Sequence, residues 1–138
     1  MGQAADLMHR KIAAFSAQDS KEFEAFLSAD IEWAIPGGLL RGPDQVAAFN
    51  SAFWEAFPDV KLTATHVIEK GSTVLTEARA EGTHQGTFHT PGGDIPPTGK
   101  RVSLPYSESY EVEEGLIVSA RTIFDRLELL EQLGVAPA

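Results

Sequence analysis

Residues 101–124 read RVSLPYSESYEVEEGLIVSARTIF, and polar and apolar residues alternate on both sides of Glu114-Gly115. Successive side chains of a strand point to opposite faces, so this alternation predicts two β-strands, at 101–113 and 116–124. An acidic residue followed by glycine suits a two-residue hairpin loop, because such loops need a backbone conformation that glycine adopts readily. The second half of the chain therefore should contain a long antiparallel hairpin.

More strands are expected upstream of this hairpin, and helices before them. Segments 60–69 and 72–88 also alternate in twos, and Gly71 marks the turn between them. The first part of the chain instead repeats its apolar residues at helical spacing. The other expected elements are a helix at 3–17, a short helix after the D-x-x-E capping box at Asp19, a strand at 31–35, a helix opened by Gly42-Pro43 and ended by Pro58, and a last helix that starts at Asp125 and ends at Gly134.

This order of elements predicts a single α+β domain over residues 1–138. We expect a curved antiparallel sheet of four long strands plus a short one, with three N-terminal helices on its concave side and a short C-terminal helix. Such an arrangement leaves a pocket between helices and sheet. The stretch TPGGDIPPTG at 90–99 is too long for a tight turn and is restricted by its prolines. We expect it to form a semi-rigid lip at the pocket mouth or an edge that packs on a partner.

Composition narrows the functional classes. Hydrophobic residues make up 43% of the 138 residues, which is enough for a real core. The absence of cysteine rules out disulfides and thiolate metal sites, and the net charge of −9 argues against nucleic-acid binding. No apolar run reaches the roughly 20 residues of a membrane helix, and the start lacks the apolar core of a signal peptide. We therefore expect a cytoplasmic protein with no membrane partner.

The expected pairing places a polar cluster on the inner face of the hairpin. The even positions of 101–113 are apolar or aromatic apart from Glu108. A two-residue loop sets Glu108 opposite Arg121 and puts Asp125 on the same face, whereas a slip of one residue would send both to the outer face. The even positions of 72–88 are small or apolar and should also face inward. The expected pocket-facing polar residues are His84, Tyr106, Glu108, Tyr110, Ser119, Arg121 and Asp125.

Metal binding is not expected. His84 and His89 fall on opposite faces of the segment 72–88, and the chain has no short pair such as H-x-H. Other candidates come from the first half: Asn50 lies toward the apolar side of its helix, and Trp33 and Trp54 can form a pocket wall.

Four of the candidates also have purely structural interpretations. Asp125 begins a D-x-x-E sequence and can simply cap the last helix. His84 can be a core histidine with its hydrogen bonds satisfied. The pair of Glu108 and Arg121 can be a buried ion pair without a role in chemistry.

Several motifs occur in a fixed order along the chain. They are EW-x-x-PGG at 32–38, FPDVKL at 57–62, GTHQGTF at 82–88, IPPTGKRV at 95–102 and EEGLIVSARTIFDRLELLEQLG at 113–134. They resemble the SnoaL-like polyketide cyclases, which are similar to the wider nuclear-transport-factor-like group of cone-shaped α+β domains. The resemblance implies homodimers and an intramolecular aldol ring closure, with the acid/base at the residue that opens the last helix, here Asp125. Relatives usually have tryptophan four residues earlier, in an E-H-W run, where this chain has Ser119-Ala120-Arg121.

These observations predict a cofactor-independent cyclase or isomerase that removes a proton next to a carbonyl group. Asp125 would be the general base, and His84, Arg121 or Tyr106 would stabilise the enolate. The expected substrate-binding residues are Arg121, Glu108, Tyr106, Tyr110, Trp33, Asn50 and Trp54. The ligand is expected to be small, and apolar or carbonyl-containing, and no cofactor is expected.

Two alternatives stay open. In the first, the same pocket holds a small apolar ligand and performs no chemistry. The second, ranked lower, is an epoxide hydrolase of the limonene-epoxide-hydrolase type, which needs an arginine and two carboxylates around a water. Arg79-Ala80-Glu81 has the required spacing but falls on the polar face, and Thr122 stands where the second carboxylate is needed.

Overall fold

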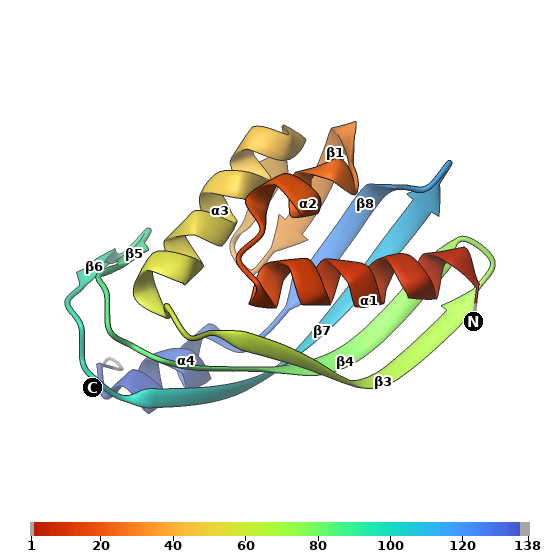
Figure 1. Cartoon of the computed structure of the whole chain (residues 1–138). Helices are drawn as coiled ribbons and strands as arrows, with labels where there is room; N and C mark the ends of the chain where they lie inside the picture. Colours follow the sequence, from red (N-terminus) through yellow and green to blue (C-terminus); the bar gives the residue numbers. More distant parts are fainter. Residues whose placement is uncertain (1, 136–138) are drawn as a thin grey trace.

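The computed structural model describes residues 2–135 and consists of a large curved sheet, a small hairpin and four helices within that range (Figure 1). In chain order the elements are α1 (Gln3–Ser16), α2 (Ser20–Ala25), β1 (Leu27–Ile35), β2 (Gly38–Arg41), α3 (Gly42–Ala56), β3 (Lys61–Lys70), β4 (Thr73–Thr83), β5 (Phe88–Thr90), β6 (Gly93–Ile95), β7 (Arg101–Glu113), β8 (Leu116–Ile123) and α4 (Arg126–Leu133). The α+β class is confirmed, as are the three N-terminal helices, the four long strands β3, β4, β7 and β8, and the short C-terminal helix.

The large sheet has the strand order β2-β1-β8-β7-β4-β3. All neighbours are antiparallel except β1 and β8, which are parallel, so the expectation of a fully antiparallel sheet is wrong at this one pair. The connection from β1 to β8 contains β2, α3 and the strands from β3 to β7, so it is long enough to return the chain in the same direction. The short strand β2 extends the sheet beyond β1 as an antiparallel edge.

The predicted strand at 72–88 divides into two parts. β4 ends at Thr83, and Phe88 begins a separate hairpin of β5 and β6 that contains most of the expected lip. The chain leaves the sheet because the backbone N–H groups of Gln85 and Gly86 donate to the carbonyl oxygen of Ala56, at the end of α3. Any side chain at Gly86 would collide with the backbone of Glu55, so this close approach requires glycine.

Two β-bulges set which side chains face inward. The Glu114-Gly115 turn forms as predicted, with φ of 51° and 78°, and Glu113 pairs with Leu116. The ladder then shifts at Val118, which has no partner, so that Glu108 lies opposite Thr122 rather than Arg121. A second shift in β3, at Thr65, turns His66 outward, where it is exposed beside Glu77.

The helices cover the inner face of the sheet and enclose the core between them. α1 packs across β3, β4 and β7, α3 packs on β1 and β2, and α4 packs against β7 (Figure 1). Gln132 of α4 fixes this last contact, because its side chain both accepts from the backbone N–H of Ser103 (2.8 Å) and donates to its carbonyl (2.9 Å). Within residues 2–135, no helix is long and apolar enough to cross a membrane.

Candidate functional site

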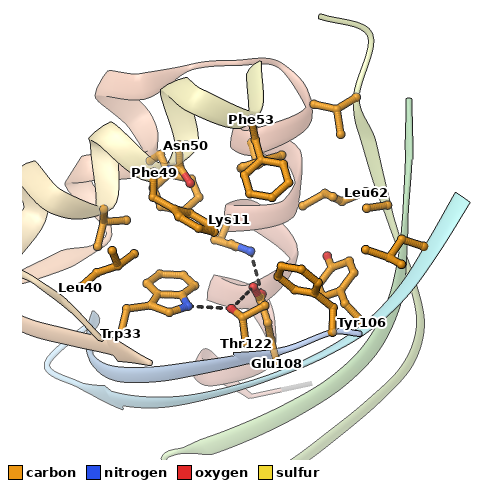
Figure 2. A pocket seen from close by; sticks show the side chains of 17 residues that line it. Lys11, Trp33, Leu40, Phe49, Asn50, Phe53, Leu62, Tyr106, Glu108 and Thr122 are labelled. Atoms are coloured by element: carbon orange, nitrogen blue, oxygen red, sulfur yellow. Dashed lines mark hydrogen bonds and ion pairs between the residues drawn. The ribbon is translucent and has the colours of Figure 1, made fainter. Parts of the chain in front are cut away.

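A cavity of about 80 Å³ lies between α1, α3 and the inner face of the sheet. Its wall is mostly apolar and includes Phe23, Leu40, Val46, Phe53, Leu62 and Leu104. Figure 2 shows Phe49, Asn50 and Phe53 on the α3 side, facing Trp33, Thr122 and Glu108 on the strand side. Within the described residues, Glu108 is the one carboxylate and Lys11 the one cation that line the cavity.

A chain of hydrogen bonds at the cavity floor centres on the carboxylate of Glu108 (Figure 2). Oε1 accepts from the Lys11 ammonium at 2.7 Å and also from the hydroxyl of Tyr110. Oε2 accepts from the hydroxyl of Thr122 at 2.7 Å. The Thr122 oxygen in turn accepts from the indole N–H of Trp33 at 2.7 Å. Three donors therefore hold this carboxylate, and two strands and one helix supply them.

The ion pair at the floor is almost completely removed from solvent. Lys11 is 2% exposed and Glu108 is 6% exposed. Burial of a charge is costly unless the charge is paired and hydrogen-bonded, and both conditions are met here. The Lys11 nitrogen also lies 5.5–5.9 Å from the centres of four aromatic rings, which stabilise a cation through their negative faces. These rings belong to Phe15, Phe23, Trp33 and Tyr110.

Tyr110 remains a proton donor to Glu108 over the whole physiological pH range. Its side chain is fully buried, and this burial raises the pKa of its hydroxyl well above the usual value. The negative charge of Glu108 acts in the same direction. Tyr110 therefore holds Glu108 in place by a hydrogen bond, and it does not line the cavity as a substrate-binding residue would.

Two further polar groups lie along the cavity wall. Tyr106 precedes Glu108 by two positions on β7, so both side chains project from the same face. The Tyr106 hydroxyl is buried without a hydrogen-bond partner among the described residues, and burial raises its pKa, with Glu108 adding to the effect. Asn50 of α3 is 5% exposed, and its amide makes no hydrogen bond to the other lining residues (Figure 2). Both groups are free to bind a ligand.

Three residues that were expected to face the pocket, Ser119, Arg121 and Asp125, are exposed instead, because of the bulge at Val118. Arg121 lies exposed on the outer face of the sheet, so the expected pairing with Glu108 is wrong, and Lys11 takes that place. Asp125 is exposed and caps α4, because its carboxylate accepts from the backbone N–H groups of Leu127 (2.9 Å) and Glu128 (3.2 Å). It does not line this cavity, so its expected position on the pocket face is also wrong.

Trp33 lines the cavity as expected, but Trp54 does not. The indole N–H of Trp54 donates to the carbonyl of Phe15 at 3.0 Å, and the ring packs against the Phe15 ring. Trp54 therefore joins α3 to α1.

His84 is completely buried, as its inward position predicts, but it lies outside the cavity. Its Nδ1 accepts from the backbone N–H of Thr98 at 3.2 Å and lies 2.9 Å from the Thr98 hydroxyl. The other ring nitrogen, Nε2, has no partner among residues 2–135. Burial between Phe57 and Phe88 lowers the pKa of His84, and the backbone of Gly86 acts more weakly in the opposite direction. The neutral ring thus fastens the segment around Thr98 to the end of β4.

Lys11 and Thr122 are the two floor residues absent from the predicted site. Lys11 had a signal in the sequence, because it falls on the apolar stripe of its helix between Met8 and Phe15. A charged residue in such a position calls for a buried partner. Thr122 had no comparable signal, because its inward position depends on the bulge.

Neither a metal centre nor the epoxide-hydrolase arrangement is assembled within the described residues. No group of three or more His, Asp or Glu side chains there is placed to hold a metal ion. Arg79 is exposed, and its guanidinium donates to the hydroxyl of Ser103 at 3.1 Å. The cavity thus lacks the arginine and the second carboxylate that hydrolysis of an epoxide by that route would need.

Comparison with known proteins supports the resemblance noted in the sequence. Residues 5–133 match the family described as SnoaL-like polyketide cyclase. The chain belongs to this family. Among curated proteins, none is significantly similar in sequence.

Solved structures similar to this SnoaL-like chain agree with the assignment. IdmH from Streptomyces antibioticus, a proposed polyketide cyclase, is 26% identical with a TM-score of 0.81, over 97% of this chain and 100% of that one. AclR from Streptomyces galilaeus, a proposed hydroxylase, is 25% identical with a TM-score of 0.84, over 98% of this chain and 83% of that one. A SnoaL-like protein from Jannaschia sp. CCS1 shares the fold at 23% identity, with a TM-score of 0.85 over 99% of this chain and 94% of that one. Because the first two carry different activities in their names, the fold does not fix the reaction.

Proposed function

We propose that this chain is a cofactor-independent cyclase or isomerase that removes a proton next to a carbonyl group, with Glu108 as the proton acceptor. The observation that carries the proposal is the Lys11–Glu108 pair at the floor of an apolar cavity. A buried ion pair adds little stability compared with apolar residues of similar volume, so its position beside ligand space favours a role in chemistry. Membership in a family of cyclases supports the same class of reaction.

Glu108 has room to accept one proton. A carboxylate offers about four lone-pair positions, and Lys11, Tyr110 and Thr122 use three of them. Two of these donors meet at Oε1, so one position on Oε2 is left for the proton of a bound ligand. Because Trp33 donates to the Thr122 hydroxyl, it directs that hydroxyl's own proton toward Oε2 and orients the carboxylate.

Lys11 would stabilise the negative charge that develops on the ligand. As the proton passes to Oε2, the electrons of the broken C–H bond form the double bond of an enolate, and the carbonyl electrons move onto oxygen. The Lys11 ammonium has three N–H donors and gives one to Glu108, so two remain for this oxygen, and Asn50 offers its amide. The enolate carbon then attacks a second carbonyl, which closes a ring, or is protonated elsewhere, which gives an isomer.

The second candidate is a binding protein that performs no chemistry. The capping of α4 by Asp125 removes the other carboxylate expected at the site, which favours this alternative.

Proton exchange separates the two candidates. Acetone is small enough to probe a cavity of about 80 Å³, and its methyl protons exchange with D₂O when a base removes them. The enzyme should accelerate this exchange, which is followed by proton NMR. Glu108→Gln should reduce the acceleration by roughly 100-fold or more. The variant is assayed below its own melting temperature, so that the loss does not come from unfolding. Acetone binding with no faster exchange than in buffer would support the binding protein instead.

We also propose that the chain forms a homodimer through the outer face of the sheet. Ile68 and Leu75 lie opposite one another on β3 and β4 and are 66% and 49% exposed, and Ile123 on β8 is 58% exposed. Light scattering at micromolar concentration should give twice the chain mass of 14.9 kDa. Ile68→Lys should shift this mass toward that of a single chain if the face is used.

A further inference from the structure

A second cleft lies directly outside the cavity. It has a volume of about 300 Å³ and is formed by α3, the β5–β6 hairpin and α4. Its walls are mainly apolar and include Ile35, Ala52, Phe88 and Leu130. The inner cavity, at about 80 Å³, is smaller than the roughly 150 Å³ cavity that admits benzene in another protein. A ligand with two fused rings therefore needs the space of the outer cleft.

Three phenylalanines separate the two spaces. Phe49, Phe53 and Phe124 line both the cavity and the cleft. Phe53 is the central ring of the three, with its centre 5.0 Å from that of Phe49 and 6.5 Å from that of Phe124. Rings in contact at their faces and edges present an apolar, flat boundary to both spaces, against which the body of a ligand that extends along both can lie.

The charges at the outer cleft leave one cation without an acidic partner. His89 lines the cleft, but its two ring nitrogens lie 2.7 Å from Glu55 and 2.8 Å from Asp94, and neither carboxylate lines the cleft. Arg126 lines the same cleft, and its guanidinium makes one long hydrogen bond, 3.3 Å, to the carbonyl of Pro36. Among the described residues no carboxylate pairs with Arg126, so most of its donors remain available to an anion.

We propose that the outer cleft is a second binding site, which holds the distal part of an elongated ligand and its anionic end group. The apolar body lies against the three shared phenylalanines, the anionic group binds Arg126, and the carbonyl group enters the inner cavity. The position of the carbonyl rests on the proposed function, whereas the binding of the anionic end to Arg126 does not depend on any reaction.

A pair of naphthalene probes tests the site. The first is 6-acetyl-2-naphthoate, which has a ketone at one end and a carboxylate at the other, and the second is 2-acetylnaphthalene, which lacks the carboxylate. Dissociation constants are measured from naphthalene fluorescence. Arg126→Met should weaken binding of the carboxylate probe about fivefold, the size expected for one exposed charge contact, and leave the neutral probe unchanged. Arg101→Met is the matched control, because Arg101 is also exposed and lines neither space, and it should change neither constant.

A second variant tests the cleft itself. Ala52 lines the outer cleft but not the cavity, so Ala52→Phe should fill the cleft and weaken both naphthalene probes at least tenfold. The exchange of acetone should be unaffected, because the inner cavity is unchanged.

Several results would overturn the second site. These are equal effects of Arg126→Met on both probes, equal effects of Arg101→Met and Arg126→Met, or unchanged binding in a folded Ala52→Phe variant. If Ala52→Phe does not fold, the comparison of the two probes in the arginine variants decides alone. Failure of the proposed function is recognised separately, as tight binding of both probes without any exchange of acetyl or acetone protons.

Discussion

Replacement of Lys11 by methionine tests whether the site depends on a buried charge pair. The substitution keeps an unbranched side chain and removes the cation, so that Glu108 retains only the hydroxyls of Tyr110 and Thr122 as donors. A buried carboxylate that loses its cation destabilises a protein by roughly 3–5 kcal/mol, and the two remaining hydrogen bonds favour the lower end. We expect the free energy of unfolding to fall by about 3 kcal/mol, measured by urea unfolding followed through tryptophan fluorescence.

The double variant Lys11→Met, Glu108→Gln is the control. It removes both charges and keeps similar volumes, so it should recover most of the stability that the single variant loses. A loss below about 1 kcal/mol in the single variant, or an equal loss in both variants, would show that the charge is hydrated and that the reasoning is wrong.

Three further predictions concern residues outside the cavity. Arg121→Ala should leave the free energy of unfolding in urea within about 0.5 kcal/mol of the wild-type value, because Arg121 is exposed on the outer face. A loss of several kcal/mol would indicate that Arg121 pairs with Glu108 after all. Asp125→Ala should lower that free energy by about 1 kcal/mol and Asp125→Asn by much less, because asparagine also caps helices; equal losses would argue against capping. Burial lowers the pKa of His84, so the unfolded chain takes up its proton first as the pH falls through about 6.5 and stability decreases toward acid. In His84→Asn, the free energy of unfolding in urea should fall less steeply between about pH 7 and 5. An unchanged dependence on pH would contradict the assignment of this decrease to His84.

Most of the fold was predictable because its signals are local. Alternation identified the strands of residues 101–124, a single dipeptide located their turn, and capping residues located the starts of α2 and α4. The parallel pairing of β1 with β8 was not predictable, because it joins segments distant in sequence and leaves no pattern in either. The break between β4 and β5 depends on contact of Gly86 with the end of α3, which is equally non-local.

The site was harder to predict because the face to which a strand residue points depends on whether an odd or an even number of residues separates it from the turn. One extra residue, Val118, reverses the facing of every residue that follows it in β8, so Thr122 enters the cavity and Arg121 leaves it. On β7, which lies before the bulge, the predicted inward positions of Tyr106, Glu108 and Tyr110 were correct. The missing partner of Glu108 was visible in the sequence as Lys11, a cation on an apolar helix face, but only the structure shows which of the acidic residues it meets.

The indole N–H signals of the two tryptophans test within one spectrum whether a ketone binds at the cavity floor. Trp33 donates to Thr122 beside Glu108, whereas Trp54, which does not line the cavity, donates to the backbone carbonyl of Phe15. In a titration of nitrogen-15-labelled protein with acetone, the Trp33 signal should shift along a saturating curve while the Trp54 signal stays fixed. If the Trp33 signal does not move at acetone concentrations that support proton exchange, the ligand binds elsewhere and Glu108 is not the proton acceptor.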